Sequence, residues 1–180
     1  SNHDEQRGRM SRLLSGWDLG LSGVALQEIS VSTPQEAEQK VWMPFGKHQS
    51  RGKEFLLPFY MESSGTQGAF VLLSRLLEAL ETGGLAVIDE FENDLHPHML
   101  EPILDLFANP STNPHQAQLL FTCHAMEVLN LIHKSQVMLV QKDVDCESTA
   151  SRLDAVEGIR NDDNFYAKYM AGAYGAVPVF

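Results

Sequence analysis

The sequence predicts an α/β fold with a mostly parallel sheet flanked by helices and a small β-layer at the N-terminal side. Short apolar runs at 85–88, 119–121 and 137–140 are typical of parallel strands buried on both faces. Helical patterns alternate with these runs, as expected for parallel strands joined by helical crossovers. The 180 residues are 43% hydrophobic and 21% charged, values that fit one globular domain with a core.

The first third of the chain predicts the β-layer. Residues 1–12 are polar, which indicates a flexible N-terminus or a cloning remnant, and we assign residues 13–180 to one domain. A short amphipathic helix is expected at 13–21. Turn residues separate three expected strands, at 24–31, 41–45 and 55–60. Residues 13–61 therefore form a β-rich segment.

Helical patterns dominate the segment from 62 to 180. A strong pattern at 66–80 ends at Gly83-Gly84, and a second helix is expected from Pro97 to about Phe107. A third is expected near 163–170.

Charge and hydropathy exclude several classes of protein. The chain has 13 Lys+Arg against 24 Asp+Glu, a net charge of -11, so we expect no direct nucleic-acid binding. No run approaches the roughly 20 apolar residues of a membrane span, and the polar start is no secretory signal. The expected location is the cytoplasm, without a membrane partner.

Two carboxylates follow the apolar run at 85–88. The run delivers Asp89 and Glu90 to the carboxyl end of a strand, where open α/β sheets bind ligands. Neighbouring residues of a strand point to opposite sides, so the two carboxylates have different roles. In nucleotide hydrolases the first holds Mg²⁺ and the second polarises the attacking water. The alternative is a buried strand followed by an acidic turn.

Small polar residues precede the helix expected at 66–80. A helix N-terminus exposes N–H groups and a partial positive charge, so Ser64 and Gly65 are suited to cradle a phosphate. The alternative is an ordinary capped helix start, with Ser63, Ser64 or Thr66 as the N-cap.

Three histidines lie near these strands. His124 follows the run at 119–121, where it is suited to donate a hydrogen bond to a γ-phosphate or to cap the next helix. His96 and His98 follow Asn93 and Asp94, but no Cys/His spacing completes a zinc site, so a metal reading is disfavoured.

The order and spacing of these candidates resemble the C-terminal part of an ABC ATPase head with a P-loop NTPase-like fold. A helix-starting Ser-Gly-x-Gln lies about twenty residues before apolar-Asp-Glu, and a strand-ending histidine lies about thirty-five residues beyond. The resemblance assigns four motifs to these residues. In it the signature motif is Ser63, Ser64, Gly65, Thr66 and Gln67, and Walker B is Asp89 and Glu90. The D-loop is Asn93 and Asp94, and the switch histidine is His124.

The sequence is most similar to prokaryotic AAA/ABC-type ATP-binding proteins related to the RecF, SMC and OLD groups. Their motifs match here over about residues 12–180, at Glu62–Thr66, 89–97, Asn113-Pro114, 118–124, Lys142 and 169–178. Several members of this group act in phage defence, some beside a nuclease partner.

The resemblance implies an ATPase that dimerises around ATP. Asp89 is expected to bind Mg²⁺ and Glu90 to act as general base, while Ser64, Gly65 and Gln67 sense the γ-phosphate across a homodimer interface. His124 is expected to report the presence of the γ-phosphate.

A phosphate loop, Gly-x-x-x-x-Gly-Lys-Ser/Thr, is missing from the 180 residues. Gly46-Lys47 and Gly52-Lys53 lack both the upstream glycine and the following Ser/Thr. We therefore expect the chain to be the C-terminal half of the head, inactive alone and completed by its own N-terminal Walker A segment.

Two other functions stay open. The chain is alternatively a catalytically silent interaction module that partners an ATPase or a nuclease. A third interpretation makes Asp143, Asp145 and Glu147 a metal-dependent nuclease centre. The alternative for these three residues is a solvated turn between two strands.

Overall fold

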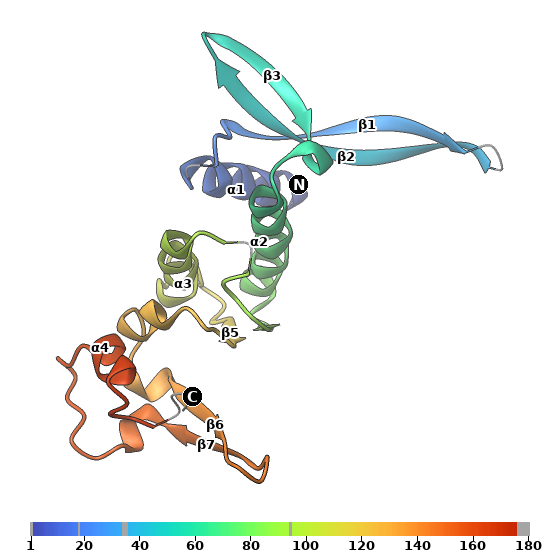
Figure 1. Cartoon of the computed structure of the whole chain (residues 1–180). Helices are drawn as coiled ribbons and strands as arrows, with labels where there is room; N and C mark the ends of the chain where they lie inside the picture. Colours follow the sequence, from blue (N-terminus) through green and yellow to red (C-terminus); the bar gives the residue numbers. More distant parts are fainter. Residues whose placement is uncertain (1, 18, 34–35, 94, 176–180) are drawn as a thin grey trace. The chain divides into compact units, whose positions relative to one another are not determined.

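The computed structural model describes residues 2–17, 19–33, 36–93 and 95–175 (Figure 1). The chain divides into two compact units, residues 1–122 and 123–180. The division falls inside the segment 62–180, which the sequence analysis treated as continuous. Within the described residues, no helix has the length and apolar character needed to cross a membrane.

Helices and strands alternate irregularly along the chain. The α-helices are α1 (Asn2–Gly16), α2 (Ser64–Thr82), α3 (Leu100–Ala108) and α4 (Phe165–Met170). The strands are β1 (Gly23–Thr33), β2 (Glu36–Ser50), β3 (Lys53–Pro58), β4 (Leu85–Ile88), β5 (Gln118–Phe121), β6 (Met138–Lys142) and β7 (Ser148–Arg152). Short 3₁₀ turns include η1 (Phe59–Met61), η2 (Pro97–Met99) and η3 (Met126–Asn130).

Helix α1 occupies the segment expected to be irregular. The helix expected at 13–21 instead ends at Gly16 and extends back to Asn2. Met10 and Leu14 lie four residues apart on one helix face, and both are buried. Because α1 contacts β1 and α2, this apolar face is covered even though the rest of the helix is polar.

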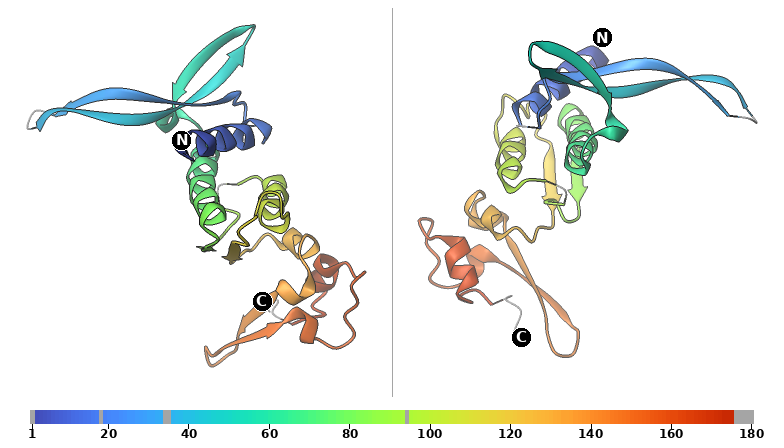
Figure 2. Two further views of the ribbon diagram at one scale, coloured as in Figure 1. Left: turned by 180° about the vertical axis from the view of Figure 1, so that it is seen from behind. Right: turned by 45° about the horizontal axis from the view of Figure 1, so that its top comes forward.

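Strand β2 belongs to two hairpins at once. Its first part pairs antiparallel with β1 and its last part pairs antiparallel with β3. Only Phe45, Gly46 and Lys47 have partners on both sides, so the expected β-layer consists of two hairpins that share one strand (Figures 1 and 2).

Helix α2 confirms the expected pattern at 66–80. Its buried face consists of leucines and smaller side chains: Thr66, Ala69, Leu73, Leu76, Leu77 and Leu80. Gly83 ends the helix with φ of 72°, and a Cβ there would lie 2.6 Å from the backbone oxygen of His115. Glycine is thus required at this position for conformation and for space.

Strands β4 and β5 form a parallel pair in register, from Leu85 opposite Gln118 to Ile88 opposite Phe121. The prediction that these strands are buried on both faces is wrong. Leu85, Val87 and Leu120 share one face and are 58%, 67% and 59% exposed. The opposite face is partly covered, since α2 contacts β4. The two-stranded sheet is therefore packed against helices on one face, and its other face is exposed.

Asn113 fixes the loop that leads into β5. Its side-chain Nδ2 donates to the backbone oxygens of Phe107 and Ala117, both at 2.9 Å, and its Oδ1 accepts from the Ala117 N–H at 2.7 Å. The side chain is buried and satisfies three backbone groups. This gives the Asn-Pro motif a local structural role.

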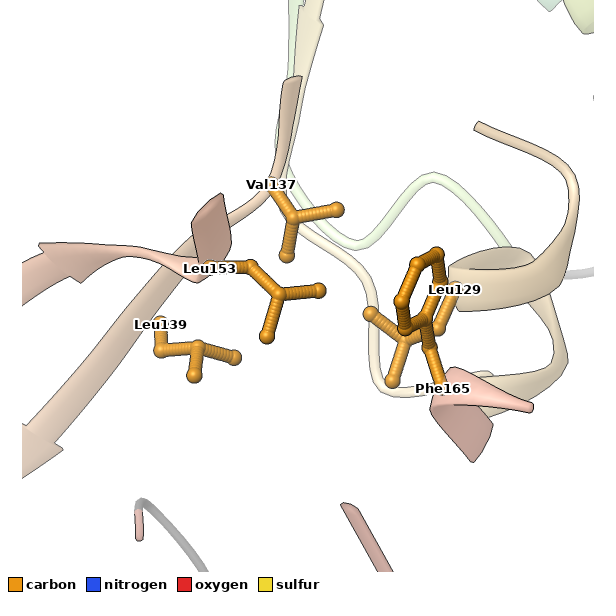
Figure 3. Close-up of a cluster of buried hydrophobic side chains, with 5 residues drawn as sticks. All are labelled: Leu129, Val137, Leu139, Leu153 and Phe165. Atoms are coloured by element: carbon orange, nitrogen blue, oxygen red, sulfur yellow. The ribbon is translucent and has the colours of Figure 1, made fainter. Parts of the chain in front are cut away.

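The second unit contains an antiparallel hairpin, with β6 paired to β7. The assignment of residues 137–140 to the parallel sheet is therefore wrong, and the mostly parallel sheet is not confirmed. In the described part of the chain, β4 and β5 are the parallel pair. A small apolar cluster holds this unit together (Figure 3): Leu129, Val137, Leu139, Leu153 and Phe165.

Candidate functional site

Thr122 connects the two carboxylates at the end of β4. Its hydroxyl donates to Asp89 Oδ1 and accepts the Glu90 backbone N–H at 2.8 Å. Its backbone continues the strand pairing, because the Thr122 N–H donates to Ile88 O and Thr122 O accepts from the Phe91 N–H. The carboxyl ends of β4 and β5 thus form one hydrogen-bonded unit. We call residues 89–93 with Thr122 the Walker B turn, after the motif that the sequence predicts there.

Glu90 has an unusual backbone conformation. Its φ is 52°, in the left-handed region, which few residues other than glycine adopt. Asn93 Nδ2 donates to Glu90 Oε2, and the Asn93 N–H donates to Glu90 O at 2.9 Å. Asn93 therefore orients Glu90 within the turn. Asp94, the other expected D-loop residue, lies outside the described residues.

The Walker B turn rests on a buried aromatic contact. Phe91 is 1% exposed, and its ring centroid lies 4.8 Å from that of Phe121. Asp89 and Glu90 themselves are exposed. The turn therefore presents two carboxylates to solvent from a packed base, and their oxygens with the Thr122 hydroxyl are the donor type that Mg²⁺ prefers.

Ser63 caps α2, as one of the two interpretations predicted. Its Oγ accepts from the Thr66 N–H at 3.2 Å and lies 2.9 Å from Thr66 Oγ1. The Ser63 backbone oxygen accepts from the Gln67 N–H. We call residues 62–67 the signature turn, after the motif that the sequence predicts there.

The remaining side chains of the signature turn divide into two groups. Gln67 Nε2 donates to Glu62 O at 2.7 Å, so this amide fastens the turn. Ser64 is exposed at the first helical position, and within the described residues no hydrogen bond uses the N–H of Ser64 or Gly65. Two backbone donors at a helix N-terminus are thus available for an anion.

Residues 2–130 match a family model described as "AAA domain, putative AbiEii toxin, Type IV TA system". The chain belongs to this AAA family. No curated protein matches the chain. The family match supports the α/β, P-loop NTPase-like fold and a nucleotide-binding, ATPase-type domain. It spans the signature turn and the Walker B turn.

The two turns of the AAA domain lie at the ends of different elements: residues 62–67 begin α2, and residues 89–93 follow β4. His124 belongs to the second compact unit and is exposed.

Neither alternative metal centre of the sequence analysis is formed. His96 and His98 pack edge to face, and Asp143 Oδ1 accepts from the N–H groups of Asp145 and Glu147 in the β6–β7 turn. In the described part of the chain, no group of three potential metal ligands assembles. Asp143 thus has the role of a turn-forming residue.

Sequence reasoning gave no role to Thr122, Glu62 or His48. Thr122 stands in the Phe-Thr-x-His motif, and its position opposite the end of β4 follows from the parallel register. Glu62 Oε1 lies 2.8 Å from His48 Nε2, a contact between residues 14 apart that no local pattern indicates.

Proposed function

We propose that this AAA domain supplies the signature turn and the Walker B turn of an ATP-hydrolysing, ABC-type head. The observation that carries the proposal is the Walker B turn: a parallel strand ends in Asp89-Glu90 and a neighbouring strand ends in Thr122, which hydrogen bonds to both. This arrangement lies at the carboxyl edge of a parallel pair, where α/β folds bind ligands.

The substrate in this proposal is ATP with Mg²⁺. Asp89 and the Thr122 hydroxyl offer the oxygen ligands for Mg²⁺, which supplies charge neutralisation at the phosphates when bound. Glu90 accepts a proton from the attacking water, and Asn93 holds the Glu90 carboxylate in place through its amide. Both carboxylates are exposed, so they are accessible to a nucleotide.

The phosphate loop comes from another segment in this proposal. The 180 residues contain no Gly-x-x-x-x-Gly-Lys-Ser/Thr sequence, and one face of the β4–β5 pair exposes Leu85, Val87 and Leu120. Contiguous exposed apolar side chains mark surfaces that bind another protein element. A segment that carries the phosphate loop and packs on this face would complete both the sheet and the site.

The signature turn acts on the nucleotide of an opposing subunit. Its free backbone donors at Ser64 and Gly65 suit a γ-phosphate, and a dimer that sandwiches two nucleotides would use them in trans. His124 serves in this proposal as the switch histidine. The family description names a toxin of a toxin–antitoxin system, which fits a role in phage defence, with or without a nuclease partner.

A second candidate function is a catalytically silent module that binds a partner ATPase or nuclease. Two features favour this module. The 180 residues contain no phosphate loop to bind ATP, and the net charge of -11 repels the negatively charged nucleotide. Exposed side chains at Leu85 and Val87 fit a partner surface equally well.

Titration calorimetry with MgATP separates the two functions. The chain is titrated alone and again after mixing with a polypeptide that carries the phosphate loop, and a colorimetric phosphate assay follows turnover. Binding and turnover in the mixture alone support the proposed head. Tight binding by the chain alone, or no turnover in a mixture that binds ATP, contradicts it, and the latter favours the silent module.

A further inference from the structure

A polar bridge joins strand β2 to the signature turn. His48 Nε2 lies 2.8 Å from Glu62 Oε1, and the side chains are 16% and 7% exposed. His48 Nδ1 lies 3.0 Å from the backbone oxygen of Gly20. A carbonyl oxygen only accepts, so this contact places a hydrogen on Nδ1 and leaves Nε2 to share a hydrogen with the carboxylate. The ring also stacks on Phe55, with centroids 5.2 Å apart.

Gly46 provides the space for this bridge. Gly46 and His48 lie two residues apart on β2 and therefore on the same face of the strand. A Cβ built on Gly46 would overlap Glu62 Oε1 and would lie 2.8 Å from Leu21 Cδ2. The carboxylate can cross the strand to reach His48 only because position 46 has no side chain.

The bridge acts on the signature turn through Glu62. The side chain of Glu62 is held by His48, while its backbone oxygen accepts from Gln67 Nε2 at 2.7 Å. The next residue, Ser63, is the N-cap of α2. The carboxylate therefore fixes the residue from which the turn starts.

We propose that His48 is a positioning residue for the signature turn, which it orients through Glu62 across Gly46. This inference rests on the proposed function for its effect on ATP. The body of α2 has its own anchors, because Leu73, Leu76, Leu77 and Leu80 are buried. Loss of the bridge is therefore expected to loosen residues 62–67 and to leave the middle of α2 intact.

Hydrogen exchange of the 180-residue chain tests the positioning directly. The Thr66 and Gln67 amides donate to Ser63, so their exchange reports the turn. His48→Ala is expected to speed their exchange roughly 3- to 10-fold, the effect of one lost hydrogen bond, with no change at Leu76 or Leu77. Equal acceleration along the whole helix, or none at the turn, overturns the proposal.

Conservative variants keep the test valid if His48→Ala fails to fold. His48→Gln retains a donor toward Glu62 and is expected to restore slow exchange at the turn. Gly46→Ala leaves both partners in place but displaces the carboxylate, so it is expected to reproduce the effect of His48→Ala. Gly16→Ala is the matched control, because a Cβ there meets nothing within 4 Å. Slow exchange in Gly46→Ala contradicts the inference.

A kinetic measurement separates this inference from the proposed function. In the chain completed with its phosphate-loop polypeptide, His48→Ala is expected to lower kcat roughly 3- to 10-fold and to leave the ATP KM unchanged, since nucleotide is held by the other elements. A raised KM with normal kcat overturns the positioning role. If the wild-type mixture has no ATPase activity, the proposed function fails, and the exchange result still decides whether His48 orients the turn.

Discussion

The signature turn and the Walker B turn both lie at the end of a regular element, but they use their side chains differently. In the signature turn Ser63, Thr66 and Gln67 bond to the turn itself, and the exposed Ser64 hydroxyl and the backbone N–H groups of Ser64 and Gly65 are left for a ligand. In the Walker B turn the exposed carboxylates of Asp89 and Glu90 are the groups available to a ligand. A backbone donor recognises an anion without a proton transfer, whereas a carboxylate can hold a cation or accept a proton.

The comparison predicts that the largest effect on catalysis comes from Glu90. Glu90→Gln keeps the size of the side chain and removes its basicity, so kcat of the completed ATPase is expected to fall about 10²-fold or more while MgATP still binds. Phosphate release and calorimetry measure the two quantities. Glu101→Gln, at an exposed position of α3, is the matched control. Normal turnover by Glu90→Gln would remove Glu90 from the role of base.

Thr122 is expected to have a smaller effect than Glu90 because it accepts no proton in the proposed reaction. Thr122→Val removes the hydroxyl that bonds to Asp89 and to the Glu90 N–H, and we expect kcat to fall about tenfold, the upper effect of losing one or two such hydrogen bonds. Thr122→Ser retains the hydroxyl and is expected to recover most of the activity. Steady-state kinetics of the three proteins decide this, and equal activity of the valine and serine variants would refute the assignment.

The two serines of the signature turn sharpen the difference between capping and binding. Ser63→Ala removes the N-cap and is expected to lower the free energy of unfolding by about 1 kcal/mol. Ser64→Ala removes an exposed hydroxyl and is expected to change it by less than about 0.5 kcal/mol. Urea denaturation of the chain measures both.

The same two variants are expected to show the opposite order in ATPase activity, with the larger loss in Ser64→Ala. A greater destabilisation by Ser64→Ala would mean that the cap is misassigned. A greater loss of activity in Ser63→Ala at matched folded fractions would mean that Ser64 faces no phosphate.

Local patterns predicted the parts of the fold that depend on neighbouring residues. The helix at 66–80 and its end at Gly83 follow from an apolar repeat and a glycine, which act within a few residues. The first part of α1 was missed because its burial depends on contacts with β1 and α2 and not on a local apolar pattern. The pairing of β6 was missed because β7 is exposed throughout and carries no strand pattern.

The candidate site shows the same limit. The placement of Asp89 and Glu90 after a strand could be predicted, because the apolar run stops there. The contacts of Thr122 could not, because they depend on the register between β4 and β5. The bridge from His48 to Glu62 depends likewise on the β2 path and on the space at Gly46.

Helix α4 is a second helix whose start is capped by a side chain. Asn164 caps it, and Asp163 bonds to Lys168 at 2.6 Å. The hydrogen bond from Lys168, followed by that from the Arg160 N–H, lowers the pKa of Asp163. A carboxyl whose pKa is lower in the folded state stabilises the fold above its unfolded pKa of about 3.9, and this stabilisation is lost as pH falls through the folded value.

Asp163→Asn is therefore expected to lower the melting temperature slightly at pH 6 and to have no effect once pH lies below the folded pKa of Asp163. Thermal unfolding of the two proteins between pH 6 and pH 2.5 measures the difference. Because α4 lies outside residues 2–130, which the family model matches, the variant is expected to leave the ATPase activity of the completed head unchanged at pH 7.5. A loss of activity with an unchanged melting temperature would mean that stabilising a helix start and supporting ATPase activity are not separable in this chain. The contrast between Ser63 and Ser64 would then lose its basis.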